Sequence, residues 1–380
     1  MDFLTQVPHY IIPFLVVLSI LVFVHELGHY LVARWCGVRV EAFSIGFGRE
    51  LFGFRDKHGT RWKLCMIPLG GYVQMFGDAD PTSSTTKLEK VKTLTPEEKN
   101  AAFYYKPVWQ RILIVAAGPA INFIYAIVVL SILFSVQGQM YSPAEIGGLV
   151  EQGPAEKAGF VIGDKIVSIN GKRIVRFQDM QREINVNLGD KMTFVVEREG
   201  VTQTITASPE VVAQTDNFGF KHMIGRMGIV STTKAEIKQH NPGSAIIAAF
   251  EETWSMSVAT LKAIGQMITG TRSADELGGV IRIGAYAKEF SDAGILSLMM
   301  FSALISVNLG LINLFPIPLL DGGHLVFYAY EGIFRKPMPE RVRMTALKIG
   351  YVFVVTLMLY ATFNDLLQLK VFSYIANLGS

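Results

Sequence analysis

Two histidines and a glutamate lie within five consecutive residues, His25-Glu26-Leu27-Gly28-His29, near the end of the first apolar stretch. On an α-helix, His25 and His29 stand one turn apart and about 40° apart around the axis, and Glu26 lies within about 100° of both. Two imidazoles on one face can bind a zinc ion, and a carboxylate beside them can act as a base on water. Ionisable groups in an apolar span are costly and mark functional sites. The spacing predicts a catalytic metal site, and the alternative is a polar cluster that faces other helices.

A catalytic zinc usually takes three protein ligands, so a third donor is expected elsewhere in the chain. The best candidate is Asp321, which follows Pro316 and Pro318 in a later apolar stretch. Prolines interrupt the hydrogen bonding of a helix, and such a break at membrane depth is tolerated only where it is buried or lines a cavity. Counted from the arginines that follow their stretches, His25 and Asp321 both lie about 13–20 Å inside the same face. His324, two glycines further on, is the rival ligand.

The composition indicates a membrane protein. Of the 380 residues, 50% are hydrophobic and 18% are charged, which is too apolar for an ordinary soluble protein. Four stretches are long and apolar enough to cross a bilayer, namely residues 9–34, 108–136, 295–330 and 346–368. The first stretch lacks the basic region and cleavage site of a signal peptide, so we expect it to be a retained span.

Residues 244–270 are also apolar, but Glu251, Glu252 and Lys262 interrupt them. Each such charge costs about 2.5–3.5 kcal/mol at mid-membrane. We therefore expect an amphipathic surface helix here, within a connecting region at residues 210–294.

The net charge argues against a nucleic-acid-binding protein, and the cysteine content argues against a disulfide-stabilised one. The net charge is only +3, and the basic residues are spread through the loops, so nucleic acid is not an expected partner. Cys36 and Cys65 are too few for a disulfide framework and have no metal-type spacing. We expect both to be packing thiols.

The distribution of basic residues predicts the orientation in the membrane. Lysine and arginine are frequent in the loop from Arg34 to Arg111 and in the short loop that carries Arg335, Lys336, Arg341 and Arg343. Loops with this excess of basic residues stay on the cytoplasmic side. Four spans then place the N-terminus, residues 137–294 and the C-terminus outside. In a Gram-negative cell this is the periplasmic side of the inner membrane, and the metal site lies towards the cytoplasm.

Two segments outside the apolar stretches have structure of their own. Residues 43–76 contain short β-prone runs separated by turn residues, which predicts a small hairpin sheet within a first domain at 1–136. The sheet is apolar enough to enter the membrane where protein or water satisfies its edges, and the alternative is a soluble cytoplasmic hairpin. Residues 137–209, with their Pro-Ala, Ala-Gly, Gly-Asp and Asn-Gly pairs, resemble a PDZ domain.

The predicted fold is an α-helical membrane protein with four transmembrane helices, a membrane-associated β-hairpin sheet and an inserted α/β PDZ domain. Its last domain, residues 295–380, holds two of the four helices and the Asn-x-x-Pro-x-Pro-x-x-Asp-Gly motif.

These motifs together resemble the site-2 protease family of zinc intramembrane metalloproteases. The family is marked by His-Glu-x-x-His in one span and Asn-x-x-Pro-x-Pro-x-x-Asp-Gly in a later one, and both are present. With the PDZ-like insert and the run Gly118-Pro119-Ala120-Ile121-Asn122-Phe123, the chain resembles the bacterial RseP group, the regulator-of-sigma-E proteases, over nearly all its length.

The resemblance implies three zinc ligands, one catalytic carboxylate and two asparagines that hold the substrate backbone. The implied zinc ligands are His25, His29 and Asp321, and the implied catalytic carboxylate is Glu26. The asparagines are Asn308 and Asn313. The implied substrates lie in the lipid bilayer and are single-span membrane proteins, such as a trimmed anti-sigma factor, or remnant signal peptides. Many members have two tandem PDZ domains and this chain has one, which puts their substrate gating in doubt here.

Two other functions make different demands on the sequence. A zinc-dependent membrane scaffold or chaperone acting through its PDZ domain would need no acid/base group, because a structural zinc site is closed by four ligands. A metal transporter would place ionisable residues at successive depths of several spans, whereas here they converge at one. A zinc metalloendopeptidase is therefore the predicted activity.

Overall fold

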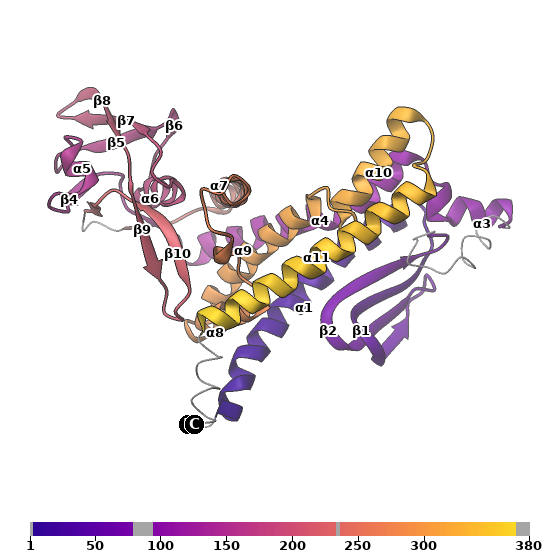
Figure 1. Cartoon of the computed structure of the whole chain (residues 1–380). Helices are drawn as coiled ribbons and strands as arrows, with labels where there is room; N and C mark the ends of the chain where they lie inside the picture. The colour runs from indigo at the N-terminus through magenta and orange to yellow at the C-terminus, as the bar shows by residue number, and fades with distance from the viewer. Residues whose placement is uncertain (1–2, 79–93, 233–235, 370–380) are drawn as a thin grey trace. The chain divides into compact units, whose positions relative to one another are not determined.

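The computed structural model describes residues 3–78, 94–232 and 236–369 (Figure 1). By its internal contacts the chain forms two compact units, residues 1–129 with 282–360 and residues 130–281 with 361–380. Its helices and strands are, in chain order, α1 (Phe3–Trp35), β1 (Val40–Arg55), β2 (Arg61–Met75), α3 (Pro96–Ala101), η1 (Phe103–Tyr105), α4 (Val108–Val136), β3 (Gln139–Tyr141), β4 (Ile146–Leu149), α5 (Pro154–Lys157), β5 (Lys165–Ile169), β6 (Lys172–Arg173), α6 (Phe177–Val186), β7 (Met192–Arg198), β8 (Val201–Ala207), β9 (Glu210–Thr215), β10 (Lys221–Arg226), β11 (Ile229–Ser231), β12 (Glu236–Lys238), α7 (Pro242–Ile268), η2 (Ala274–Glu276), α8 (Val280–Asp292), α9 (Ile295–Leu314), α10 (Asp321–Phe334) and α11 (Glu340–Gln368).

Four helices within the described residues are long and apolar enough to cross a membrane: His9–Trp35 of α1, α4, α9 and α11. Three of them match the predicted stretches 9–34, 108–136 and 346–368. The third predicted stretch, 295–330, consists of α9 and α10 with a break between them. The prediction of four spanning helices is confirmed at the level of length and apolar character.

The β1–β2 sheet is more folded than a plain hairpin. β1 bends back at Gly46 and Gly48, which both have a φ of +85°, a conformation that only glycine adopts readily. Residues 40–45 consequently pair with 71–75 on one side and with 61–64 on the other, while 50–55 pair with 61–65. The segment 71–75 is therefore an outer edge of the sheet.

An aromatic cluster fixes this sheet against α1. Phe43 of β1 stacks on Trp62 of β2 with ring centroids 4.3 Å apart, and Tyr30 of α1 contacts both rings edge-on. Asp56 in the β1–β2 turn accepts hydrogen bonds from the Tyr30 hydroxyl and the Trp62 indole, each at 3.0 Å. Burial opposes the ionisation of Asp56, but these bonds and the amides of the turn outweigh it and lower the pKa of Asp56 to about 2. The charged turn thus holds the sheet to the helix that carries His25.

The second unit contains the PDZ-like module. Its four-stranded sheet has the order β6-β5-β7-β8, and the apolar faces of the sheet and of α6 share one core around Phe194, Ile166 and Met180. β11 pairs with β4, so a strand of this module comes from beyond residue 209, the predicted end of the PDZ domain. α7 corresponds to the segment expected to be a surface helix.

The polar side of α7 packs on α6 within the second unit. Glu252 of α7 is buried and makes ion pairs with Arg176 and Arg182. The other side of α7 exposes large apolar residues such as Ile247 and Trp254. Glu252, one of the charged residues that interrupt the apolar run, thus attaches the helix to the module through its ion pairs.

In the first unit a largely buried ion pair joins α4 to α10, the helix that begins at Asp321. Arg111 and Glu331 lie 2.6 Å apart, with side chains 9% and 21% exposed, and Arg111 also donates to the Lys106 carbonyl. Removing one member of a buried pair leaves the other charge without compensation. We expect Glu331→Ala to lower the free energy of unfolding in detergent micelles by about 3 kcal/mol.

The double variant Arg111→Met with Glu331→Leu is the control for this effect. It removes both charges, so it should recover most of the stability lost in Glu331→Ala. Equal free energies of unfolding for Glu331→Ala and the parent chain would show that the ion pair does not stabilise the contact between α4 and α10.

Candidate metal centre

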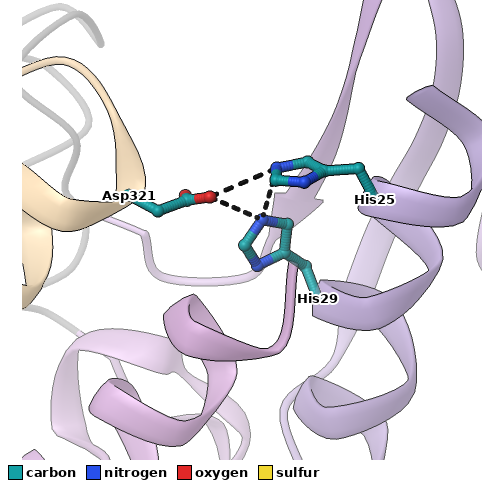
Figure 2. Close-up of side chains that lie close together, drawn as sticks. All are labelled: His25, His29 and Asp321. Carbon is teal, nitrogen blue, oxygen red and sulfur yellow. Dashed lines mark hydrogen bonds and ion pairs between the residues drawn. The ribbon is translucent and has the colours of Figure 1, made fainter. Parts of the chain in front are cut away.

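The structure brings His25, His29 and Asp321 together, although almost 300 residues separate the histidines from the aspartate (Figure 2). The Nε2 atom of His25 lies 3.2 Å from Asp321 Oδ2, that of His29 lies 3.5 Å from the same oxygen, and the two Nε2 atoms are 3.3 Å apart. The side chains are only 12%, 11% and 18% exposed. Three potential ligand atoms thus point at one another inside the first unit.

This arrangement fits a zinc ion. Nitrogen and oxygen ligands about 2.0–2.2 Å from a tetrahedral zinc lie roughly 3.3–3.6 Å from one another, close to the three separations observed. Asp321 Oδ2 is buried and has no hydrogen-bond partner among the described residues. The His29 Nδ1 atom lies 2.9 Å from the Ile114 carbonyl, and an Nδ1–H that donates there leaves the Nε2 lone pair for a metal. Three ligands also leave the fourth position that a catalytic site needs.

Gly118 of α4 gives the two imidazoles the space they occupy. A Cβ atom at this position would lie 2.2 Å from His29 Nε2 and 2.9 Å from His25 Cε1. Gly28 similarly permits close contact between α1 and α4, because its Cβ would lie 2.4 Å from the Ala117 carbonyl oxygen. In the sequence, Gly118 belongs to the run that resembles the RseP group, and its packing role becomes visible only in the structure.

The break between α9 and α10 places Asp321. Leu319 has a φ of +123°, a strained conformation for a residue with a side chain. The chain then turns so tightly that a Cβ at Gly322 would lie 2.2 Å from the Phe315 carbonyl oxygen, and one at Gly323 would lie 2.4 Å from that of Ile317. The two glycines therefore let α10 begin directly at Asp321, where a helix N-terminus also favours a carboxylate.

Glu26 lies between the histidines and the sheet. Its carboxylate lies near the backbone of Val73 in β2 and near the side chains of His25, His29 and Asp321. Gly71 leaves space between the sheet and α1, since a Cβ there would lie 2.6 Å from the Ser44 carbonyl oxygen, 2.8 Å from Val22 Cγ1 and 3.1 Å from Glu26 Cγ. The carboxylate is thus held beside the ligand group without belonging to it.

The remaining predicted site residues lie elsewhere on α9 and α10. Asn308 and Asn313 are both half-buried on α9, and their five-residue spacing puts them about 140° apart around the helix axis. The two amides therefore do not face the same side. His324, the rival ligand, packs edge-on against Phe327, and it is absent from the ligand group found among the described residues.

Comparison with known proteins finds a protein family and several relatives that match most of the chain. Residues 13–357 match the model of peptidase family M50. A protein of Mesorhizobium japonicum, named as a proposed zinc metalloprotease, is 42% identical over 359 residues, which cover 94% of this chain and 98% of the relative. Metalloprotease MmpA of Caulobacter vibrioides is 36% identical over an alignment that covers 97% of this chain and 98% of the relative.

Solved structures match part of the chain, and one of them is a PDZ domain. The PDZ domain of an SdrC-like protein from Listeria monocytogenes has 20% sequence identity and a TM-score of 0.19, and the match covers 24% of this chain and 88% of that domain. The matches over the full length carry the assignment. The chain belongs to peptidase family M50 and is a membrane zinc metalloprotease of the site-2 type.

Proposed function

We propose that this protease hydrolyses peptide bonds in or beside the transmembrane segments of single-span membrane proteins. The observation that carries the proposal is the position of the metal centre. His25 and His29 belong to a helix apolar enough to cross the membrane, and Asp321 begins the helix directly after the break that follows another such helix. A peptide bond cut at this centre must come from a segment that enters the same apolar surroundings.

The edge of the sheet next to Glu26 offers a place for the substrate. Within the described residues, strand pairing occupies only one side of segment 71–75, and Gly71 and Val73 of this segment contact Glu26. A helical substrate must unwind before its backbone can be attacked, and an unwound strand can add to a free sheet edge. Exposed Leu51, Phe52 and Met66 on the same sheet support its association with the membrane. Asn308 and Asn313 remain our candidates for contacts to the unwound backbone.

The residues of the centre divide the catalytic work. His25, His29 and Asp321 would hold zinc, which when bound lowers the pKa of a water ligand and polarises the scissile carbonyl. Glu26 would take the proton of the attacking water and pass it to the leaving nitrogen. The Val73 amide would keep the Glu26 carboxylate oriented.

The PDZ-like module is proposed to select substrates. A cavity of about 510 Å³ lies between α6, β11 and the β9–β10 hairpin, with an apolar lining that includes Met180, Ile184 and Ile229. The module would capture a newly exposed C-terminus there by strand addition, or exclude proteins with bulky external domains. The substrates would accordingly be trimmed anti-sigma factors or remnant signal peptides in the bacterial inner membrane, with the module on the periplasmic side.

A cleavage assay with purified full-length protein tests this function. A single-span protein with a short external tail is incubated with and without a zinc chelator, and the products are located by mass spectrometry. We expect one main cut within or next to the span that the chelator abolishes and added zinc restores. A chelator-insensitive cut, or efficient cleavage of unfolded soluble protein only, would contradict the proposal.

A further inference from the structure

Asn122 is a buried polar residue that the mechanism above does not use. It lies on α4, one helical turn beyond Gly118, and it is fully buried. Its amide nitrogen Nδ2 is 3.0 Å from His25 Nδ1. An uncharged amide in an apolar helix is costly unless it is hydrogen-bonded, so its contact with a proposed zinc ligand calls for an explanation.

The orientation of the amide follows from the role of His25. Its Nε2 atom faces His29 and Asp321, so a metal would bind there and the ring proton would sit on Nδ1. An Nδ1–H needs an acceptor, which an amide nitrogen cannot be. With Nδ2 towards His25, moreover, Asn122 Oδ1 is buried with no hydrogen-bond partner among the described residues. A 180° rotation of the amide exchanges the two atoms and gives Oδ1 the His25 proton.

The packing of α9 holds Asn122 in this position. The Ser306 hydroxyl donates to the Asn122 carbonyl at 2.9 Å. A Cβ on Gly310, one turn further along α9, would lie only 3.3 Å from Asn122 Cβ. Asn122 is thus packed closely against α9, with its side chain fully buried.

We propose that Asn122 is a positioning residue for the metal centre, whose amide oxygen accepts the Nδ1–H of His25 and so presents Nε2 to zinc. His29 is oriented in the same way by the Ile114 carbonyl two turns earlier on α4. One face of α4, residues 114, 118 and 122, thereby sets the tautomer and the spacing of both imidazoles. This inference rests on the proposed assignment of His25 as a zinc ligand.

The zinc dissociation constant of full-length protein in detergent, measured by competition with a chromophoric chelator, tests the proposal. Asn122→Leu and Asn122→Ala remove the acceptor and should weaken zinc binding roughly 10–100-fold, the usual effect of losing a partner of a metal-bound histidine. Asn122→Asp keeps an acceptor and should stay within about threefold of the parent. Tyr125→Phe, which loses only the hydrogen bond between α4 and Ser302 of α9, is the matched control and should bind like the parent.

The His25→Ala background separates positioning from general damage. His25→Ala alone should weaken zinc binding, and adding Asn122→Leu to it should cause no further loss, because the two residues act as one unit. Equal loss in both backgrounds, parent-like binding by Asn122→Leu and Asn122→Ala, or equal loss in Asn122→Asp and Asn122→Leu would each overturn the role of Asn122. Parent-like binding by His25→Ala would overturn the zinc assignment itself, and the inference with it.

Discussion

Glu26→Gln should reduce peptide hydrolysis by about 10²–10⁴-fold, the range over which a positioned acid/base group acts, while zinc remains bound. The substitution keeps the size of the side chain and leaves all three ligand residues in place. It removes only the group that we propose accepts the water proton. Turnover by the purified variant and its zinc content, measured on the same sample, test both halves of the prediction.

Glu251→Gln is the matched control, because Glu251 is an exposed glutamate on α7 and should tolerate the same change without loss of turnover. Near-normal turnover in Glu26→Gln would show that another group takes the proton. Loss of zinc together with activity would instead mean that Glu26 contributes to metal binding, contrary to its place beside the ligand group.

Asp321→Ala should abolish activity by a different route, through loss of zinc. The substitution leaves two imidazoles and no carboxylate, so zinc binding should weaken by more than the roughly 10–100-fold expected for losing a residue that only orients a ligand. Equilibrium dialysis of the purified variant against buffered zinc measures this directly.

His324→Ala provides the control three residues further along α10. It removes the rival imidazole, which packs on Phe327, and should leave zinc binding unchanged. If His324→Ala loses zinc and Asp321→Ala retains it, the third ligand has been assigned to the wrong residue.

The sequence could predict the spans and the ligand group because the signals for both are local. The four stretches show as long apolar runs, and the spacing of His25 and His29 follows from the period of one helix. Asp321 could be proposed as a ligand because Pro316 and Pro318 predict an interruption of a span, and the structure has a break at residues 315–320.

The features that the sequence left open depend on contacts between distant segments. The double pairing of β1 requires the fold-back at Gly46 and Gly48, and many glycines in the chain make no such turn. β11 pairs with β4 about 80 residues earlier, so the period of β-prone residues near 140–209 could not reveal it. The space that Gly118 leaves for the two imidazoles also depends on contacts between α1 and α4. In the sequence, a small residue one helical turn before an asparagine in an apolar span indicates a helix-packing face.

X-ray absorption at the zinc edge of the loaded, purified protein tests the central claim most directly, because it reports which atoms surround the metal. The account predicts nitrogen and oxygen neighbours at about 2.0–2.2 Å, with the outer-shell scattering of two imidazoles that falls to one in His25→Ala and is unchanged in Glu26→Gln. A sulfur neighbour from Cys36 or Cys65, or a spectrum that His25→Ala leaves unaltered, would contradict it.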